Sequence, residues 1–317
     1  GNTMYRKVTQ GDGGVIFVLD TSISNELTID YNLIDSLCVS VDGLCKGFDG
    51  GRVNSEVHAE LVSGIAAGKG YKGGGTGVAP EAGVVNVEVW HPRDPRGYNS
   101  ADVIAAVYKV ALAEAYNHSP GEFRAFAINY SGAEYVDYSG SNCDEVNFVF
   151  QRIAAMTRTK GVPFFAAAGN DSVPKAGWPA CSSLVQAVTG SDRIRPEKGE
   201  IVHAQPIDPT DLTLAQANEA YIWKADGDVW GLGGTSVSTP LVTAQALLYQ
   251  LASQKYRGIT LTPSEIYAFM AQYGDKVPYA DYTGYAWAAR IDNIFRNMGF
   301  MPYARLVFPS ITQSRIQ

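Results

Sequence analysis

The 317-residue sequence contains no unbroken apolar run of about 18 residues, the length that a membrane-spanning helix requires. Its basic residues are scattered, and 25 Lys and Arg stand against 32 Asp and Glu, so there is no basic stripe for a nucleic acid. The N-terminal segment lacks the apolar core of a signal peptide. We therefore expect no membrane span and no nucleic-acid partner, and either a protein without a signal peptide or a mature or trimmed chain.

Cysteine is also scarce, and its four occurrences include no CxxC pair: Cys38, Cys45, Cys143 and Cys181. A structural zinc site would need closer spacing and usually nearby histidines. Disulfide bonds are the better interpretation and would indicate an exported protein, whereas four free thiols would indicate a cytosolic one. The spacing alone leaves all three pairings open.

Short apolar, β-branched runs alternate along the chain with longer segments of helical periodicity. This alternation predicts an α/β fold with a mostly parallel sheet and helices on both faces. Residues 21–54 are polar and loop-like, and a polar piece around 211–222 has a helical composition. The predicted strands are 13–20, 82–90, 123–132, 162–170 and 182–190, and the predicted helices are 55–68, 100–118, 147–161, 236–255 and 262–274.

Residues 233–240, GGTSVSTP, precede the apolar run LVTAQALLYQLA. Small hydroxyl residues and Pro240 are typical of a helix start, because Ser and Thr cap the backbone and the N–H that proline lacks is not needed in the first turn. A cap explains only one of the three hydroxyls, and it leaves the glycines beside Ser236 unexplained. The second interpretation is a nucleophilic Ser236 at the positive end of a helix.

A nucleophilic serine needs a base, normally a histidine oriented by a carboxylate. None of the four histidines follows Ser236, which excludes the order Ser–Asp–His of α/β-hydrolases. Asp20 ends a predicted strand, and His58 lies near the start of a predicted helix. Each alone is better explained as a cap or surface residue, but the order Asp20, His58, Ser236 is that of a known serine-peptidase arrangement.

Five segments in succession resemble the signature segments of subtilisin-like serine peptidases, the subtilases. Those around Ser236 and Asn170 are the most specific. The segments are VLDTSI (18–23), HAELVSGIAAG (58–68), GVAPEAGVVNVEVW (77–90), FFAAAGN (164–170) and GGTSVSTP (233–240).

The resemblance implies a three-layer subtilisin-like fold, with residues 1–317 as one catalytic domain in mature form. It implies a serine endopeptidase in which Asp20, His58 and Ser236 form the catalytic triad. Asn170 takes the family's oxyanion position. The mechanism expected from these groups is acyl transfer without a cofactor.

The resemblance also implies a pocket for the side chain before the cut, with Gly177 of AGWPA as its floor. A glycine floor leaves room for a large side chain, so we expect large apolar or aromatic residues there. Asp171 at the rim would attract Lys or Arg as well. The substrate-binding residues implied are Ser131, Gly132, Ala133, Ala167, Ala168, Gly169 and Gly177.

The disulfide pairing expected from this resemblance joins Cys143 to Cys181, as in many exported subtilases. That leaves a short local bridge between Cys38 and Cys45. The closed loop of about 39 residues would stabilise the fold by roughly 3–4 kcal/mol in the chain-entropy model. We therefore expect a secreted or otherwise exported protein.

Some segments depart from the family's usual pattern. Ala59-Glu60-Leu61 replaces the usual Gly-Thr-His, Thr21-Ser22-Ile23 lacks a usual glycine, and the segments that usually precede the nucleophile are unrecognisable in 191–232. Every bond-making group is retained, but no calcium site can be carried over, so structural calcium has no assigned ligands.

Three hypotheses follow for function. The first is an exported, monomeric endopeptidase that acts on proteins or peptides and is made with an inhibitory propeptide. The second is a catalytically silent protein of the same fold that binds peptides, which loss of a triad residue would have signalled. The third is a non-proteolytic binding domain, which five ordered segments disfavour.

Overall fold

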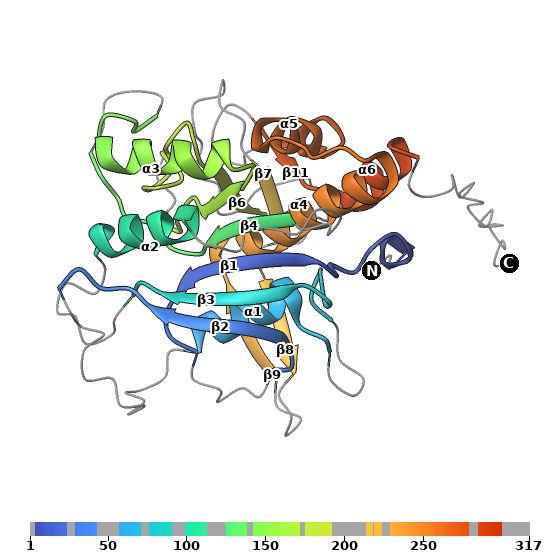
Figure 1. Cartoon of the computed structure of the whole chain (residues 1–317), viewed down its shortest axis with the longest axis horizontal. Helices are drawn as coiled ribbons and strands as arrows, with labels where there is room; N and C mark the ends of the chain where they lie inside the picture. The colour runs from blue at the N-terminus through green and yellow to red at the C-terminus, as the bar shows by residue number, and fades with distance from the viewer. Residues whose placement is uncertain are drawn as a thin grey trace, which may run out of the picture.

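The computed structural model describes residues 4–23, 29–42, 57–70, 76–90, 99–112, 125–137, 142–171, 175–191, 214–217, 219–223, 229–278 and 285–299. Within them, nine strands form one sheet in the order β10-β11-β7-β6-β5-β4-β1-β3-β2 (Figure 1). All neighbours are parallel except β10 and β11. The strands are β1 (Gly14–Asp20), β2 (Asn32–Cys38), β3 (Gly83–Glu88), β4 (Ala125–Tyr130), β5 (Phe164–Ala167), β6 (Gln186–Ser191), β7 (Leu214–Ala217), β10 (Asp275–Pro278) and β11 (Tyr285–Ala288).

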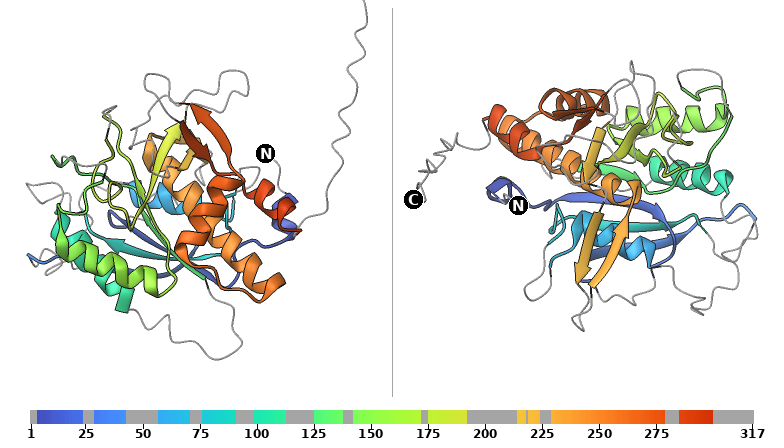
Figure 2. Two further views of the ribbon diagram at one scale, coloured as in Figure 1. Left: turned by 90° about the horizontal axis from the view of Figure 1, so that it is seen from above. Right: turned by 180° about the vertical axis from the view of Figure 1, so that it is seen from behind.

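Helices cover both faces of this sheet, and a separate antiparallel hairpin of β8 (Glu219–Trp223) and β9 (Val229–Gly233) leads into α4 (Figure 2). The three-layer α/β architecture expected from the alternation is therefore confirmed. The helices are η1 (Met4–Lys7), α1 (His58–Ala67), α2 (Ser100–Leu112), α3 (Phe148–Thr159), α4 (Thr235–Arg257), α5 (Pro263–Gln272) and α6 (Ile291–Asn297).

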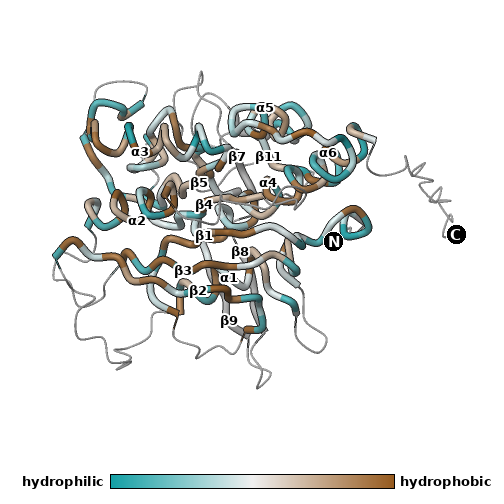
Figure 3. The backbone as a smooth tube through the Cα atoms, viewed as in Figure 1, coloured by the Kyte–Doolittle hydropathy of each residue, from teal (hydrophilic) through white to brown (hydrophobic). Residues whose placement is uncertain are grey.

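Strand β1 shows why two cores form. Its side chains alternate between the sheet faces, as the pleat requires. Ile16 and Val18 pack into the core beneath α1, α4, α5 and α6, whereas Phe17 and Leu19 pack beneath α2 and α3. Because both faces are buried, β1 and β3 are apolar along most of their length (Figure 3).

Helix α4 lies almost wholly inside the molecule and packs against strands β1, β4, β5, β6 and β7. Its amino end reaches the carboxyl edge of the sheet, the edge where ligands bind in open α/β folds. The helix therefore carries Ser236 to the same edge as the ends of β1 and β5.

Two sequence predictions about elements are wrong. Part of the loop expected over 21–54 is strand β2, which among the described strands pairs with β3 alone. Its residues are exposed from Asn32 to Leu37, so its sequence lacks the apolar pattern of a buried strand. Where a helical piece was expected around 211–222, the described residues form strands β7 and β8, because pairing with β6 and β9 overrides a weak helix propensity. In the described part of the chain no helix is long and apolar enough to cross a membrane.

Candidate active site

Asp20 and His58 meet at the edge of the sheet. Asp20 is the last residue of β1, and His58 is the first residue of α1. The carboxylate Oδ1 lies 2.7 Å from the imidazole Nδ1. The side chain of His58 is 20% exposed and that of Asp20 only 3%. The imidazole can therefore meet a substrate, while the carboxylate behind it is shielded from water.

Thr21 holds this pair in place, a role that sequence reasoning missed. Its backbone N–H donates to Asp20 Oδ1 at 2.7 Å. Its hydroxyl oxygen accepts the N–H of Ala59 in the first turn of α1 at 3.1 Å. The side-chain amide of Asn86 on β3 donates to the Thr21 carbonyl at 3.1 Å. Thr21 thus joins the end of β1 to β3 and to the start of the histidine helix.

Ser236 lies in the first turn of α4 and is 8% exposed. The residue before the helix is Gly234, whose φ of +84° strongly favours glycine. The Ser236 hydroxyl donates to the Ser131 carbonyl at 3.0 Å. Ser131 lies just past β4, so the hydroxyl faces the segment that follows the central strand.

Pro240 does not occupy the first turn, as the sequence suggested, but lies inside α4. A proline there removes the N–H that would donate to the carbonyl four residues earlier, which is that of Ser236. The Ser131 hydroxyl replaces it and donates to the Ser236 carbonyl at 3.1 Å. The two serines are therefore joined by reciprocal hydrogen bonds, of which the proline makes the one to the Ser236 carbonyl necessary.

This serine pair continues into a buried polar network between β4 and α4. The amide nitrogen of Asn129 donates to the Ser131 hydroxyl at 3.0 Å, and the Thr243 hydroxyl donates to Asn129 Oδ1 at 3.1 Å. Asn129 and Thr243 are fully buried. Because buried polar groups are costly when unpaired, the network sets how the amino end of α4 sits against β4.

Asn170 lies just past β5, and its side chain is oriented by the start of α4. Its Oδ1 accepts the backbone N–H of Thr235 at 2.9 Å and the Thr235 hydroxyl at 3.1 Å. A Cβ on Gly234 would lie 2.7 Å from the same oxygen. Because two donors hold the oxygen, the amide nitrogen is the end left to face a ligand.

Residues 11–273 match the sequence profile of the subtilase family, peptidase family S8. The chain belongs to the subtilase family. It is thus a subtilisin-like serine endopeptidase, a hydrolase. A search of curated proteins finds no significant match.

Solved structures of two proteases share this subtilase fold. The prenylagaramide maturation protease PagA superposes with a TM-score of 0.69 at 18% identity, covering 94% of this chain and 99% of its own. A serine-to-alanine mutant of the PatA protease domain gives 0.66 at 21% identity, with 91% and 96% covered. The self-cleaved PatA protease domain gives 0.65 at 21% identity, with 92% and 98% covered.

The residues expected to line a subtilase pocket lie together. An antiparallel bridge between Glu134 and Trp178 joins the segment after β4 to the segment around the expected floor. The Gly177 N–H donates to the Ala168 carbonyl at 2.9 Å, which joins that floor to the end of β5. The segment after β4, the end of β5 and the segment around Gly177 are therefore joined to one another by backbone hydrogen bonds.

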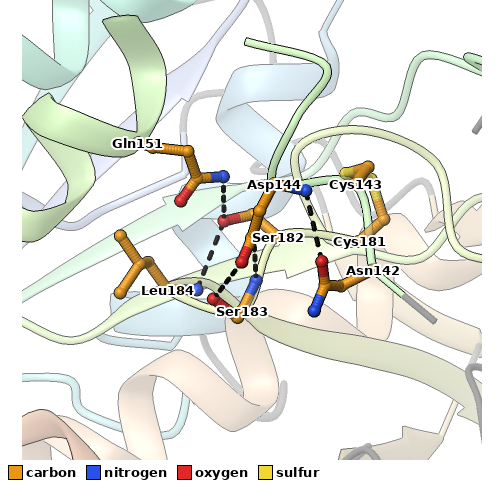
Figure 4. Close-up of a disulfide and its surroundings, with 8 residues drawn as sticks. All are labelled: Asn142, Cys143, Asp144, Gln151, Cys181, Ser182, Ser183 and Leu184. Carbon is orange, nitrogen blue, oxygen red and sulfur yellow. Dashed lines mark hydrogen bonds between the residues drawn. A yellow bond between two sulfur atoms is a disulfide. The ribbon is translucent and has the colours of Figure 1, made fainter. Parts of the chain in front are cut away.

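The expected disulfide between Cys143 and Cys181 is confirmed, with Cα atoms 5.3 Å apart (Figure 4). Asp144 strengthens this link, because its carboxylate accepts the Ser183 N–H at 2.8 Å and the Ser183 hydroxyl at 2.6 Å. Cys38 is also disulfide-bonded. Its predicted partner Cys45 lies outside the described residues.

The sequence also raised the questions of a metal site in this subtilase and of its other three histidines. Across the ranges that the structure describes, no group of three His, Cys, Asp or Glu side chains could hold a metal ion. His91, His118 and His203 lie outside those ranges.

Trp90 was missed by sequence reasoning. Its ring lies edge-on to the His58 imidazole, with ring centroids 6.3 Å apart, and forms one side of the site.

Proposed function

We propose that Asp20, His58 and Ser236 form a catalytic triad that hydrolyses peptide bonds through an acyl-enzyme intermediate. The observation that carries this proposal is the 2.7 Å contact between Asp20 Oδ1 and His58 Nδ1. An imidazole held at Nδ1 by a carboxylate exchanges protons with its reaction partners through Nε2. The subtilase family and the order of the three residues along the chain support the same assignment.

In the first half of the reaction, the Ser236 hydroxyl attacks the carbonyl carbon of the scissile bond. Its proton passes to His58 Nε2, so the hydroxyl hydrogen must first turn away from the Ser131 carbonyl that accepts it. The imidazolium then donates this proton to the leaving amine, and the acyl group stays on Ser236. Asp20 stabilises the imidazolium charge and holds the ring's tautomer.

In the second half, a water molecule attacks the acyl-enzyme, and His58 takes its proton and returns one to Ser236. Each tetrahedral intermediate carries a negative oxygen. We assign the Asn170 amide nitrogen and the Ser236 backbone N–H as its donors. The contacts of Asn170 Oδ1 with Thr235 support this assignment, because they fix the orientation of the amide group before the substrate arrives.

The substrate is a protein or peptide, as the family implies. We propose that its extended backbone pairs with residues 131–133 and that the chain acts as one catalytic domain. The Cys143–Cys181 disulfide supports an exported protein. Gly177 alone predicts a preference for large apolar residues before the cut. The close approach of Ala133 to Gly177 and Gly169 argues against that preference.

The test is reaction with a small serine-directed sulfonyl fluoride, followed by peptide mapping and a cleavage profile on a peptide library. Labelling of Ser236 together with peptide cleavage supports the proposal. Labelling lost in His58→Ala would show that the histidine activates the serine. A chain that binds peptides but is neither labelled nor active would be the silent binding protein, and the proposal would be wrong.

A further inference from the structure

The predicted pocket is narrowed by the segment that follows β4. Gly169 has no side chain, and two neighbouring residues lie where a side chain would project. A Cβ there would lie 2.1 Å from the hydroxyl oxygen of Tyr135 and 3.5 Å from the methyl carbon of Ala133. Tyr135 and Ala133 therefore cover the glycine from the opposite wall.

Ala133 also approaches the expected floor. A Cβ on Gly177 would lie 2.9 Å from the Ala133 methyl carbon. Because a C–C bond is about 1.5 Å long, that methyl carbon lies within about 5 Å of the Cα of Gly169. A flat ring between two walls needs a gap of about 7 Å, since carbon atoms in contact are about 3.5–4.0 Å apart. No aromatic side chain fits between Ala133 and Gly169.

Tyr135 is held in this position by Asp171, the residue that follows Asn170. Its hydroxyl oxygen accepts the backbone N–H of Asp171 at 3.1 Å. Burial raises the pKa of the Tyr135 phenol, and the negative charge of Asp171 acts in the same direction. The phenol therefore stays protonated at neutral pH and keeps its O–H as a donor. Glu134, which lies between Ala133 and Tyr135 in the sequence, makes two backbone hydrogen bonds with Trp178, of 2.8 and 2.6 Å.

We propose that Tyr135, with Ala133, is a specificity-determining residue that limits the pocket to small side chains before the cut. This inference rests on the proposed function, because it names the substrate class of the same site. The phenol closes the outer end of the pocket by bridging to Asp171, and the methyl group of Ala133 fills the space above Gly177. Substrates with Gly, Ala or Ser before the cut are accepted, and Phe or Tyr is excluded.

The experiment compares kcat/KM for matched peptides that carry Ala or Phe before the cut. We expect the wild type to favour Ala by at least tenfold. Tyr135→Ala should raise kcat/KM for the Phe peptide at least tenfold and leave the Ala peptide within threefold. Ala133→Gly, which removes only a methyl group, should move the ratio in the same direction. A matched control is Tyr108→Ala, since Tyr108 on α2 is 44% exposed and Tyr135 is 42% exposed.

Labelling of Ser236 by the small sulfonyl fluoride separates this inference from the proposed function. If the wild type is neither labelled nor active, the proposed function fails. If it is labelled and cleaves Phe and Ala peptides equally well, only the pocket inference fails. The inference also fails if both variants are labelled at the wild-type rate and keep the wild-type ratio. A Tyr135→Ala protein that is not labelled is misfolded, and Ala133→Gly then decides.

Discussion

The proposed reaction centre (Asp20, His58, Ser236 and Asn170) and the proposed pocket beside it (Ala133, Tyr135, Gly169 and Gly177) are built differently. In the reaction centre, side chains are held by hydrogen bonds whose partners are mostly buried. In the pocket, glycines and a methyl group are in close contact, and a half-exposed ring closes the outer end.

The difference explains why one region is visible in the sequence and the other is not. Directional hydrogen bonds require particular residue types, so they leave motifs such as the one around Ser236. Close packing requires only that neighbouring segments leave no space, and many residue types satisfy that condition. Gly177 alone therefore suggested a roomy pocket, whereas the small pocket that we propose rests on the contacts of its neighbours.

Removing the nucleophile should have the largest effect and should act on the reaction centre alone. We expect Ser236→Ala to lower kcat by on the order of 10⁶-fold, the loss typical for a triad serine. The matched control is Ser238→Ala, which removes a buried hydroxyl two residues along the same helix. Steady-state kinetics with one peptide substrate measures kcat for both variants. Equal activity of wild type and Ser236→Ala would refute the assignment.

Breaking the disulfide should disturb the pocket side and spare the chemistry. Cys143→Ser with Cys181→Ser should lower the free energy of unfolding by roughly 3–4 kcal/mol, since the closed loop spans 38 positions. Denaturant unfolding measures this, with Cys38→Ser plus Cys45→Ser as the control for a much shorter predicted loop. An unchanged unfolding midpoint in the first variant would show that the bridge contributes nothing.

Loss of the oxyanion donor should lower the rate without weakening substrate binding. We expect Asn170→Ala to reduce kcat by about 10²–10³-fold with little change in KM, because the amide acts only in the transition state. Asn297→Ala, on α6 and exposed, serves as the control. A rise in KM at constant kcat would instead assign Asn170 to ground-state binding.

The smallest effect should come from the hydrogen bond that Pro240 makes necessary. Ser131→Ala leaves the Ser236 carbonyl without its donor, so we expect a loss of about 1–3 kcal/mol in unfolding free energy. Thr239→Val is the control. The Thr239 hydroxyl donates to the Thr235 carbonyl, which already accepts a backbone N–H within the helix. Equal losses in the two variants would contradict this account of the proline.

Much of the fold could be predicted from hydrophobic periodicity. Strands β1 and β3 and helix α4 were expected within a few residues of their bounds, since burial on both faces makes their sequences apolar throughout. Strand β2 was missed because an exposed edge strand is defined by pairing, and β7 and β8 because pairing outweighed local propensity. The site was predicted as residues without their supports. Thr21 lies inside a signature segment, but its contacts with Ala59 and Asn86 depend on how β1, β3 and α1 pack, and the Asn129–Thr243 contact depends on how α4 packs on β4.

The sequence by itself determined the family and the order Asp20, His58, Ser236, because these depend on residue types at characteristic places along the chain. The Cys143–Cys181 pairing followed only from the resemblance to that family, since spacing left three pairings open. Tertiary structure alone decided which carbonyl Pro240 leaves without a donor and which hydroxyl supplies it. It also decided how much space remains beside Gly169, since Tyr135 reaches it from another segment. Distances between segments far apart in sequence arise only when the sheet and helix α4 bring those segments together.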